Sequence, residues 1–258
     1  MSETVLQGGD LNVVVRIGDT VRRPVGPWSP AVHALLLHFE AVGFDGAPRF
    51  LGVDEEGREI LSYVEGDAAF APVPECDEVV AEIGRLLRRS HDAQAGFEPP
   101  VDASWQRPAG QREHGEVICH LDLFWPNVIF RDGRVVGVID WDLAAPATRL
   151  HDLASAANFW VALRDDASCE AWGIPCDRRG ERLKALFDGY GLEQASRPGL
   201  LDAVEALNRA WLASYHRWGR DERRPGWAEI WDRDQDRYLV AKQQWLAEHR
   251  EKVAAWLS

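Results

Sequence analysis

The sequence predicts an α+β fold of two lobes: a small N-terminal lobe built on an antiparallel sheet and a larger, mostly helical C-terminal lobe. In the first part of the chain, short apolar runs alternate with glycine-containing turns, whereas from residue 77 onward apolar residues recur at helical spacing. Residues 66–74 are rich in Gly, Ala and Pro and are typical of a linker. We therefore expect lobes at 1–66 and 67–258, and 258 residues are enough to bury a core in this arrangement.

The N-terminal lobe is expected to hold five strands and a helix. The strands are predicted at 5–6, 12–17, 20–23, 48–53 and 59–64, with an acidic turn at 54–57 between the last two. The helix is predicted to start with Ser29 as the N-cap, because Pro30 then takes the first helical position. Its apolar face consists of Val32, Leu35, Leu36 and Phe39.

The C-terminal lobe is expected to be helical except around its middle. Helices are predicted at 77–93 and near 151–164, 178–190, 199–218 and 227–256, with an irregular loop at 96–116 and strands within 117–140. The twelve tryptophans lie largely in this lobe and are expected to pack in the core and between helices.

Composition excludes several classes of protein. A net charge of −13 without a basic patch argues against nucleic-acid binding, and the chain has no apolar run long enough to span a membrane. The N-terminus lacks the features of a signal peptide, and four scattered cysteines are typical of free thiols in a reducing compartment. We expect a cytoplasmic protein, a monomer or homodimer, that acts on a small molecule.

The segment from 117 to 142 contains the residues most typical of catalysis. An Asp132-Gly133 turn predicts a hairpin in which Arg131 pairs with Arg134, so that Asn127 faces Val138 and Asp140 lies one diagonal step away. Amide and carboxylate oxygens are the ligands that Mg²⁺ prefers. The hairpin therefore predicts a magnesium site at its open end.

Asp122 lies in the loop that enters this hairpin, five residues before Asn127. Its carboxylate is expected to reach the same point and to act as a base. Each aspartate alone is equally consistent with a turn or a helix cap. Together, however, the pattern His-x-Asp-x-x-x-x-Asn followed by a second Asp is typical of phosphoryl transfer.

The segment resembles the aminoglycoside phosphotransferase and choline kinase-like family, whose fold is protein-kinase-like. The matching motifs are 119–122 with Asn127, 130–133, 139–142, 144–146 and 152–154. Within this family the chain is most similar to a small bacterial phosphotransferase branch, some members of which have trifolitoxin-immunity names. The resemblance implies transfer of the γ-phosphoryl group of ATP or GTP, with Mg²⁺, to a hydroxyl group.

The resemblance also implies roles for individual residues. Asp122 would deprotonate the acceptor hydroxyl, and Asn127 and Asp140 would bind Mg²⁺. Asp152 would brace the catalytic loop, and His120 would pack that loop rather than react. Asp142 would either contact a cationic substrate or face solvent.

Nucleotide binding is expected to involve the N-terminal lobe. A glycine-rich turn would approach the phosphates, and the connection between the lobes, with Gly66 as pivot, would offer backbone groups to the base. The residues concerned are Gly8, Gly9 and Asn12 in the turn, and Ser62, Tyr63 and Val64 in the connection.

The phosphate-gripping pair of kinase-like lobes is altered in this chain. No lysine precedes Lys184, so Arg22 or Arg23 stands where the strand lysine is expected. The usual helix glutamate is also missing, because positions 31–33 are not acidic and Glu40 lies too far along the helix.

Two functions remain open from the sequence. One is a kinase that acts on a cationic or amphipathic alcohol, such as an aminoglycoside, an amino sugar or a choline-like compound; the acidic charge and Asp142 favour such an acceptor. The other is a kinase-like binding or immunity module that sequesters a peptide or an antibiotic, which the missing lysine and glutamate favour.

Overall fold

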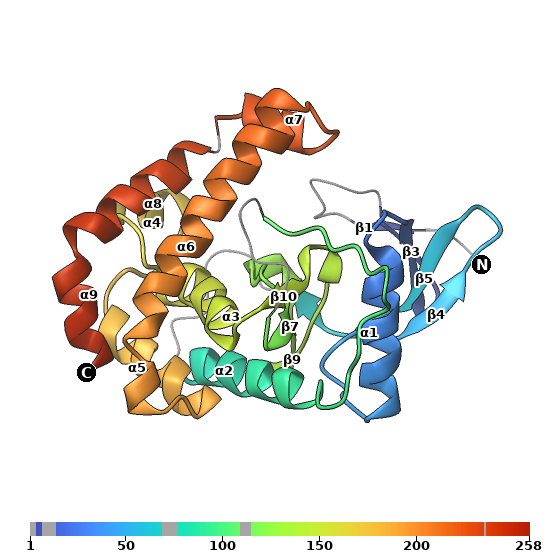
Figure 1. Cartoon of the computed structure of the whole chain (residues 1–258), viewed down its shortest axis with the longest axis horizontal. Helices are drawn as coiled ribbons and strands as arrows, with labels where there is room; N and C mark the ends of the chain where they lie inside the picture. Colours follow the sequence, from blue (N-terminus) through green and yellow to red (C-terminus); the bar gives the residue numbers. More distant parts are fainter. Residues whose placement is uncertain (1–3, 7–13, 69–76, 109–114, 235) are drawn as a thin grey trace.

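The computed structural model describes residues 4–6, 14–68, 77–108, 115–234 and 236–258. It confirms the predicted two-lobe α+β fold. Figure 1 shows the N-terminal sheet at the right and the C-terminal helices at the left. Helix α1 (Ser29–Ala41) contacts both the N-terminal sheet and the 141–143 turn of the other lobe.

The described N-terminal sheet is antiparallel, with the strand order β1-β2-β3-β5-β4. Its strands are β1 (Thr4–Leu6), β2 (Val14–Ile17), β3 (Thr20–Pro24), β4 (Phe50–Val53) and β5 (Arg58–Ser62). The predicted cap of α1 is wrong by one residue, because Trp28 is the capping residue and Ser29 begins the helix. The Ser29 hydroxyl instead accepts a hydrogen bond of 2.9 Å from the Gly26 N–H in the preceding turn.

The C-terminal lobe contains two small sheets surrounded by helices. One sheet has the order β6-β8-β9, and β7 pairs with β10 in the other. These strands are β6 (Asp67–Ala68), β7 (Val117–Cys119), β8 (Val128–Arg131), β9 (Arg134–Val138) and β10 (Ala145–Ala147). The helices are α2 (Asp77–Asp92), α3 (Arg149–Ala156), α4 (Asp166–Trp172), α5 (Arg179–Tyr190), α6 (Gly199–Ser214), α7 (Trp227–Asp232), α8 (Asp236–Glu248) and α9 (Arg250–Leu257).

Two helix predictions in this lobe are wrong in detail. The continuous helix expected at 227–256 is divided into α7, α8 and α9. A left-handed residue, Asp234 at φ 56°, follows α7, and His249 interrupts the helical backbone between α8 and α9. Helix α4 was not predicted, although the Asp165 carboxylate caps it by accepting a 2.8 Å hydrogen bond from the Ser168 N–H.

The two lobes share one apolar core. A single cluster of buried side chains runs from Val32 and Leu35 of α1 to Leu246 of α8. At the junction, Gly66 has φ 142°, and a Cβ there would lie 2.3 Å from the Phe130 carbonyl oxygen. Only glycine fits this close approach. The lobe boundary at residue 66 stays a prediction, and β6 begins directly after it.

Helices α2 and α5 cross at a contact between two glycines. A Cβ on Gly84 of α2 would lie 2.5 Å from the Leu186 carbonyl oxygen of α5. A Cβ on Gly189 of α5 would lie 2.0 Å from the Ala81 carbonyl oxygen of α2. Both neighbours are backbone, so neither can rotate away.

We expect Gly189→Ala to destabilise the protein by about 1–3 kcal/mol, because the added methyl group forces the two helices apart. Gly180→Ala in the same helix is the matched control. Its Cβ would meet the Trp256 side chain at 3.0 Å, which can move, and the helix gains propensity. Urea unfolding midpoints compare the variants; equal midpoints for both would contradict the close crossing.

Across the described residues, none of the helices combines the length and the apolar character that a membrane crossing requires.

Candidate active site

The loop between β7 and β8 holds Asp122, and helix α3 fixes its backbone. The buried Asp152 carboxylate accepts hydrogen bonds from the N–H groups of His120 at 2.9 Å and Leu121 at 2.7 Å. Ser155, one turn further along α3, accepts from the Leu123 N–H at 3.0 Å and donates to the Leu121 carbonyl at 3.1 Å. Side chains of α3 therefore bind both the N–H and the carbonyl of Leu121, the residue that precedes Asp122.

Leu121 has a left-handed backbone conformation, with φ 66°, and its side chain is completely buried. This conformation disfavours side chains with a Cβ by about 1–2 kcal/mol. Burial of the leucine and the two hydrogen bonds to Asp152 and Ser155 offset that cost. The resulting turn directs the following residue, Asp122, toward the space between the lobes.

Two histidines support this loop. The fully buried His120 ring donates a 2.9 Å hydrogen bond from Nε2 to the Ile139 carbonyl, and it packs against Trp141 with ring centroids 4.8 Å apart. His91, in the last turn of α2, is also buried. It contacts Asp152 through Nε2 at 2.9 Å and the Tyr190 hydroxyl through Nδ1 at 2.9 Å.

The buried Asp152 remains ionised because of these contacts. Burial alone would raise its pKa, but the hydrogen bond and charge of His91 and the hydrogen bond from Leu121 outweigh burial and hold the pKa below its ordinary value. His91, Cys119 and Asp152 lie within 4.8 Å of one another. Their polar atoms bond to protein groups, with the Cys119 thiol donating to the Thr148 carbonyl at 3.2 Å, so the cluster is a structural network.

The hairpin has the predicted turn but a different register. Asp132 and Gly133 have positive φ values of 51° and 72°, and Arg131 pairs with Arg134 as expected. A bulge then shifts the pairing by one residue, so Val128 and not Asn127 faces Val138.

The shift brings Asn127 closer to Asp140 along the ladder than the simple register predicts. The Asn127 carbonyl accepts a 2.8 Å hydrogen bond from the Ile139 N–H, and Asp140 follows directly. Asn127 ends a short 3₁₀ helix (Trp125–Asn127) rather than lying in β8.

Asn127 and Asp122 are joined by their side chains. The Asn127 Nδ2 group donates to Asp122 twice, at 3.0 Å to the Oδ2 atom and at 3.0 Å to the backbone carbonyl. Because these two acceptors fix which end of the amide is nitrogen, the amide oxygen faces the other way.

Asp140 lies beside this pair in a left-handed conformation, φ 64°. Its Oδ1 atom accepts from Arg23 Nη1 of β3 at 3.1 Å, which connects the two lobes across the site. Its side chain is 46% exposed, so the carboxylate is accessible to a ligand.

Arg23, and not Arg22, reaches the site. Besides Asp140 it binds Glu59 of β5, with Nε 3.0 Å from Oε1, and its Nη2 atom donates to the Asp142 carboxylate. Burial opposes a charged guanidinium, but the charges of Asp140, Asp142 and Glu59 outweigh burial and raise the Arg23 pKa. Arg22 instead lies 3.7 Å from Asp54, measured from Nε to Oδ2.

The basic residue of β3 therefore has a carboxylate partner, but not from a helix. Arg23 and Glu59 are directly opposite each other in the β3–β5 ladder, and Glu59 also binds His33 of α1. The sequence interpretation looked for this glutamate only in α1 and missed it. The signal was present, since Glu59 and Leu61 alternate as the inward residues of β5.

The remaining nucleotide candidates are placed differently. Gly8, Gly9 and Asn12 lie outside the described residues. The backbone N–H of Ser62 donates to the Arg49 carbonyl at 2.9 Å, and that of Tyr63 donates to the Asp19 carbonyl at 2.8 Å. These two donors are engaged within the lobe, which leaves Val64 as the remaining candidate of the connection.

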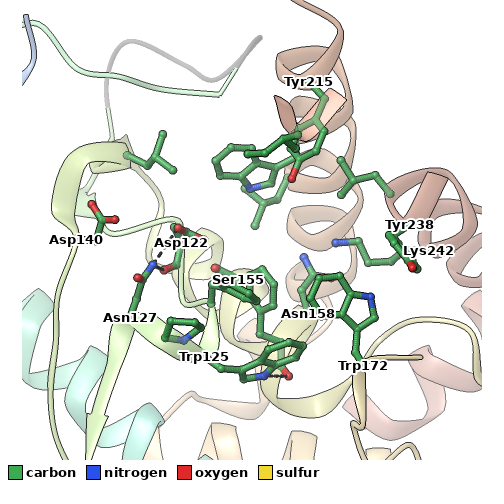
Figure 2. A pocket seen from close by; sticks show the side chains of 18 of the residues that line it. Asp122, Trp125, Asn127, Asp140, Ser155, Asn158, Trp172, Tyr215, Tyr238 and Lys242 are labelled. Carbon is green, nitrogen blue, oxygen red and sulfur yellow. Dashed lines mark hydrogen bonds between the residues drawn. The ribbon is translucent and has the colours of Figure 1, made fainter. Parts of the chain in front are cut away.

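A pocket of about 400 Å³ opens between these residues and the C-terminal helices. Figure 2 shows Asp122, Asn127 and Asp140 on one side of it and Trp172, Tyr238 and Lys242 on the other. Asp142 is absent from the described lining, and its carboxylate binds Arg23. The aromatic lining residues are Phe124, Trp125, Phe159, Trp172, Trp211, Tyr215, Trp227 and Tyr238.

Several tryptophans line the pocket. Trp141 and Trp160 are buried in the core as expected. Trp125, Trp172, Trp211 and Trp227 line the pocket, and of these Trp125 and Trp227 are also buried. Sequence reasoning also missed two buried cations of the pocket, Arg164 and Lys242, which no motif marks.

The residues present are suited to a magnesium ion. Asn127 presents an amide oxygen and Asp140 an accessible carboxylate, both in the pocket lining. Oxygen ligands from one or two side chains, completed by phosphate and water, are what Mg²⁺ requires. Asn127 and Asp140 would hold the ion.

Comparison with known proteins identifies the family. Residues 101–199 match the phosphotransferase enzyme family. Over its full length the chain is similar to a trifolitoxin immunity protein of Rhizobium leguminosarum bv. trifolii, with 36% identity over 269 residues and 99% of each chain covered. The chain belongs to the phosphotransferase enzyme family.

Two further comparisons find similarity to kinases. The chain is 33% identical over 132 residues to a homoserine kinase of Methylobacillus flagellatus, covering 48% of this chain and 35% of that protein. Its fold is similar to that of an amicoumacin kinase solved with AMP-PNP and Ca²⁺, with a TM-score of 0.64, 12% identity, and 90% and 88% of the two chains covered.

Proposed function

We propose that this phosphotransferase family member transfers the γ-phosphoryl group of ATP or GTP, with Mg²⁺, to a hydroxyl group of a small molecule. The observation that supports this most strongly is the convergence of Asp122, Asn127 and Asp140 at one side of a pocket. Arg23 joins them from the other lobe. A base and two oxygen ligands at one point are the groups that phosphoryl transfer needs.

The residues divide the reaction between them. Asp122 accepts the proton of the acceptor hydroxyl while the hydroxyl oxygen forms a bond to the γ-phosphorus. The bond from that phosphorus to the bridging oxygen breaks, and the nucleoside diphosphate leaves. Mg²⁺ at Asn127 and Asp140 would neutralise phosphate charge. Arg23 orients Asp140, and Asp152, His120 and Ser155 orient the loop.

The second candidate is a binding or immunity module. The full-length similarity to an immunity protein favours it, and so does Arg23, whose guanidinium already binds three carboxylates. A module without turnover would still use the pocket, but it would not need Asp122.

Nucleotide-induced thermal stabilisation separates the two functions. We expect MgATP or MgGTP to raise the melting temperature, and nucleotide with EDTA to raise it much less, because only the folded protein binds the ligand. Asp140→Asn should remove the difference between the magnesium and EDTA conditions, since Asp140 is an expected ligand. Absence of any shift with either nucleotide would favour the binding module.

Activity is expected to fall as pH falls through about 7. Burial raises the pKa of Asp122 to about 7, the charge of Asp140 adds to the rise, and the hydrogen bond from Asn127 opposes it. Asp122 accepts a proton only when ionised, so kcat/KM should rise with pH to a plateau. A profile that stays flat through about pH 7 would contradict the role of Asp122 as base.

The expected cationic acceptor has lost one of its supports. Asp142 was expected either to contact such a molecule or to face solvent, but its carboxylate binds Arg23 and its side chain is only 14% exposed. The chain as a whole is acidic, with a net charge of −13, but the pocket is lined by more basic than acidic residues.

A further inference from the structure

Lys242 of α8 is a buried lysine on the side of the pocket opposite Asp122, which we call the acceptor side. The residue is 6% exposed and lines the pocket, and Figure 2 shows its ammonium group pointing into the space opposite Asp122. Among the residues that the structure describes, no carboxylate lies within ion-pair distance of it and no hydrogen bond to its ammonium group is found. A buried charge without a partner is costly, and a buried titratable group that faces a cavity is a candidate for ligand binding.

The neighbourhood of Lys242 increases this cost. Burial lowers its pKa well below the ordinary value, and the positive charge of Arg164 lowers it further. Arg164 is itself 6% exposed, with Nη2 donating to the Asn158 carbonyl at 2.7 Å. Its Nε atom has no partner within the described part of the chain. Two basic side chains thus face one cavity, and among the described residues neither has a carboxylate within ion-pair distance.

The charge of the acceptor side is opposite to that of the whole protein. The chain has a net charge of −13, and the acidic residues of the described lining are Asp122 and Asp140 at the catalytic side. Beyond these and Arg23, the charged lining residues are Arg164, Arg233 and Lys242, all basic. A cationic group would be repelled from this part of the pocket, whereas an anionic group would find charge complementarity.

Aromatic walls connect the two sides. Trp125 and Phe159 hold the Arg164 guanidinium at 5.9 Å and 5.7 Å from their ring centroids. Trp172 packs against Tyr238, with centroids 5.5 Å apart, next to Lys242. Such walls favour a flat apolar body between the polar ends of a ligand.

We propose that the acceptor is a hydroxy acid: its carboxylate binds Lys242 and Arg164, an apolar, preferably aromatic body lies between the tryptophan walls, and its hydroxyl group reaches Asp122. This inference rests on the proposed phosphotransferase function only for the part that places the hydroxyl group of the ligand at Asp122. The carboxylate subsite is a binding property and is measurable without turnover.

The test compares ligands that differ only in charge. A suitable set is 4-(2-hydroxyethyl)benzoate, its primary amide and the corresponding benzylamine, extended to shorter and longer hydroxyalkyl chains. Calorimetric Kd values without nucleotide report the subsite, and ADP release with MgATP reports turnover. We expect the best acid to bind at least tenfold more tightly than its amide, and the amine to bind most weakly. Acids that bind no better than their amides throughout the series would overturn the inference.

Lys242→Met is the decisive variant, because methionine keeps the length of the side chain without the charge. It should raise the Kd of the acid at least tenfold, leave that of the amide unchanged, and keep the stabilisation by MgATP. Lys184→Met, at an exposed lysine of α5 paired with Asp188, is the matched control and should change neither Kd. If Lys242→Met does not fold, Lys242→Arg should retain the preference for the acid and Lys242→Gln should lose it.

The two proposals fail differently. Acid binding that depends on Lys242, without nucleotide stabilisation, would leave the subsite standing and refute the kinase. Nucleotide stabilisation with Mg²⁺, together with equal binding of acid and amide, would refute the subsite and leave the kinase standing. An unchanged acid Kd in Lys242→Met would also refute the subsite.

Discussion

Replacing Asp122 by Asn is expected to lower kcat by about 10²–10⁴-fold while leaving the affinity for MgATP largely unchanged. The amide has nearly the shape of the carboxylate and can still accept the 3.0 Å hydrogen bond from Asn127 Nδ2, but it cannot take a proton from the acceptor. Single-turnover rates and nucleotide Kd values measure the two effects separately. Asp132→Asn is the control, because its turn is exposed and asparagine tolerates the positive φ there.

The same variant should be at least as stable as the parent protein near pH 8. Asp122 has a pKa raised to about 7 in the folded state, so the folded protein holds its proton more tightly than the unfolded chain does. This difference in pKa stabilises the folded protein fully at pH values below about 3.9, the pKa of aspartate in the unfolded chain. The stabilisation is lost as pH rises through about 7, the pKa of Asp122 in the folded protein. Asparagine removes this dependence. Unchanged turnover in Asp122→Asn, with the fold intact, would refute the base assignment.

Replacing Arg23 by Met is expected to destabilise the protein by about 3–5 kcal/mol, because it leaves buried carboxylates without their cation. The Arg23 side chain is 7% exposed, and Glu59 and Asp142, which bind it, are 3% and 14% exposed. Among the residues that the structure describes, Glu59 would keep the contact to His33. Urea unfolding at constant pH measures the loss, and MgATP affinity should fall with it because Asp140 also loses its contact across the lobes.

Two substitutions make this result specific. Arg22→Met changes the adjacent residue, whose contact to Asp54 is 3.7 Å long, and should cost no more than about 1 kcal/mol. Arg23→Lys keeps one charge but lacks the three-way guanidinium geometry, so an intermediate loss is expected. Equal losses for Arg22→Met and Arg23→Met would contradict the central position of Arg23.

Local sequence signals predicted much of the fold and part of the site. Alternation and glycine turns predicted the N-terminal strands, helical periodicity predicted α1, α2, α5 and α6, and Asp-Gly predicted the β8–β9 turn. The spacing of Asp122, Asn127 and Asp140 pointed to one site because all three lie within a single hairpin and its entering loop. Contacts between residues close in the chain depend on local geometry, which the sequence encodes directly.

The errors have a common physical cause. The bulge in the hairpin places Asn127 opposite Ile139, and β9 bonds to distant segments on either side of it: the Val135 N–H donates to Glu82 of α2 and the Val138 N–H to the Gly46 carbonyl. Glu59 became the partner of Arg23 because β5 lies beside β3, although 36 residues separate them in the sequence, 23 to 59. Asp142 turned inward to Arg23 rather than toward a substrate.

The amino-acid sequence alone therefore determined the two-lobe class and most of its larger elements, together with the expectation that three oxygen-bearing side chains gather around the hairpin. Only the tertiary structure decided which arginine enters the site, which glutamate binds it, and that Lys242 and Arg164 face the catalytic side across an aromatic pocket. Those contacts join residues from distant segments, and burial sets their charges and partners. Burial is a property of the packed chain and not of any local stretch of it.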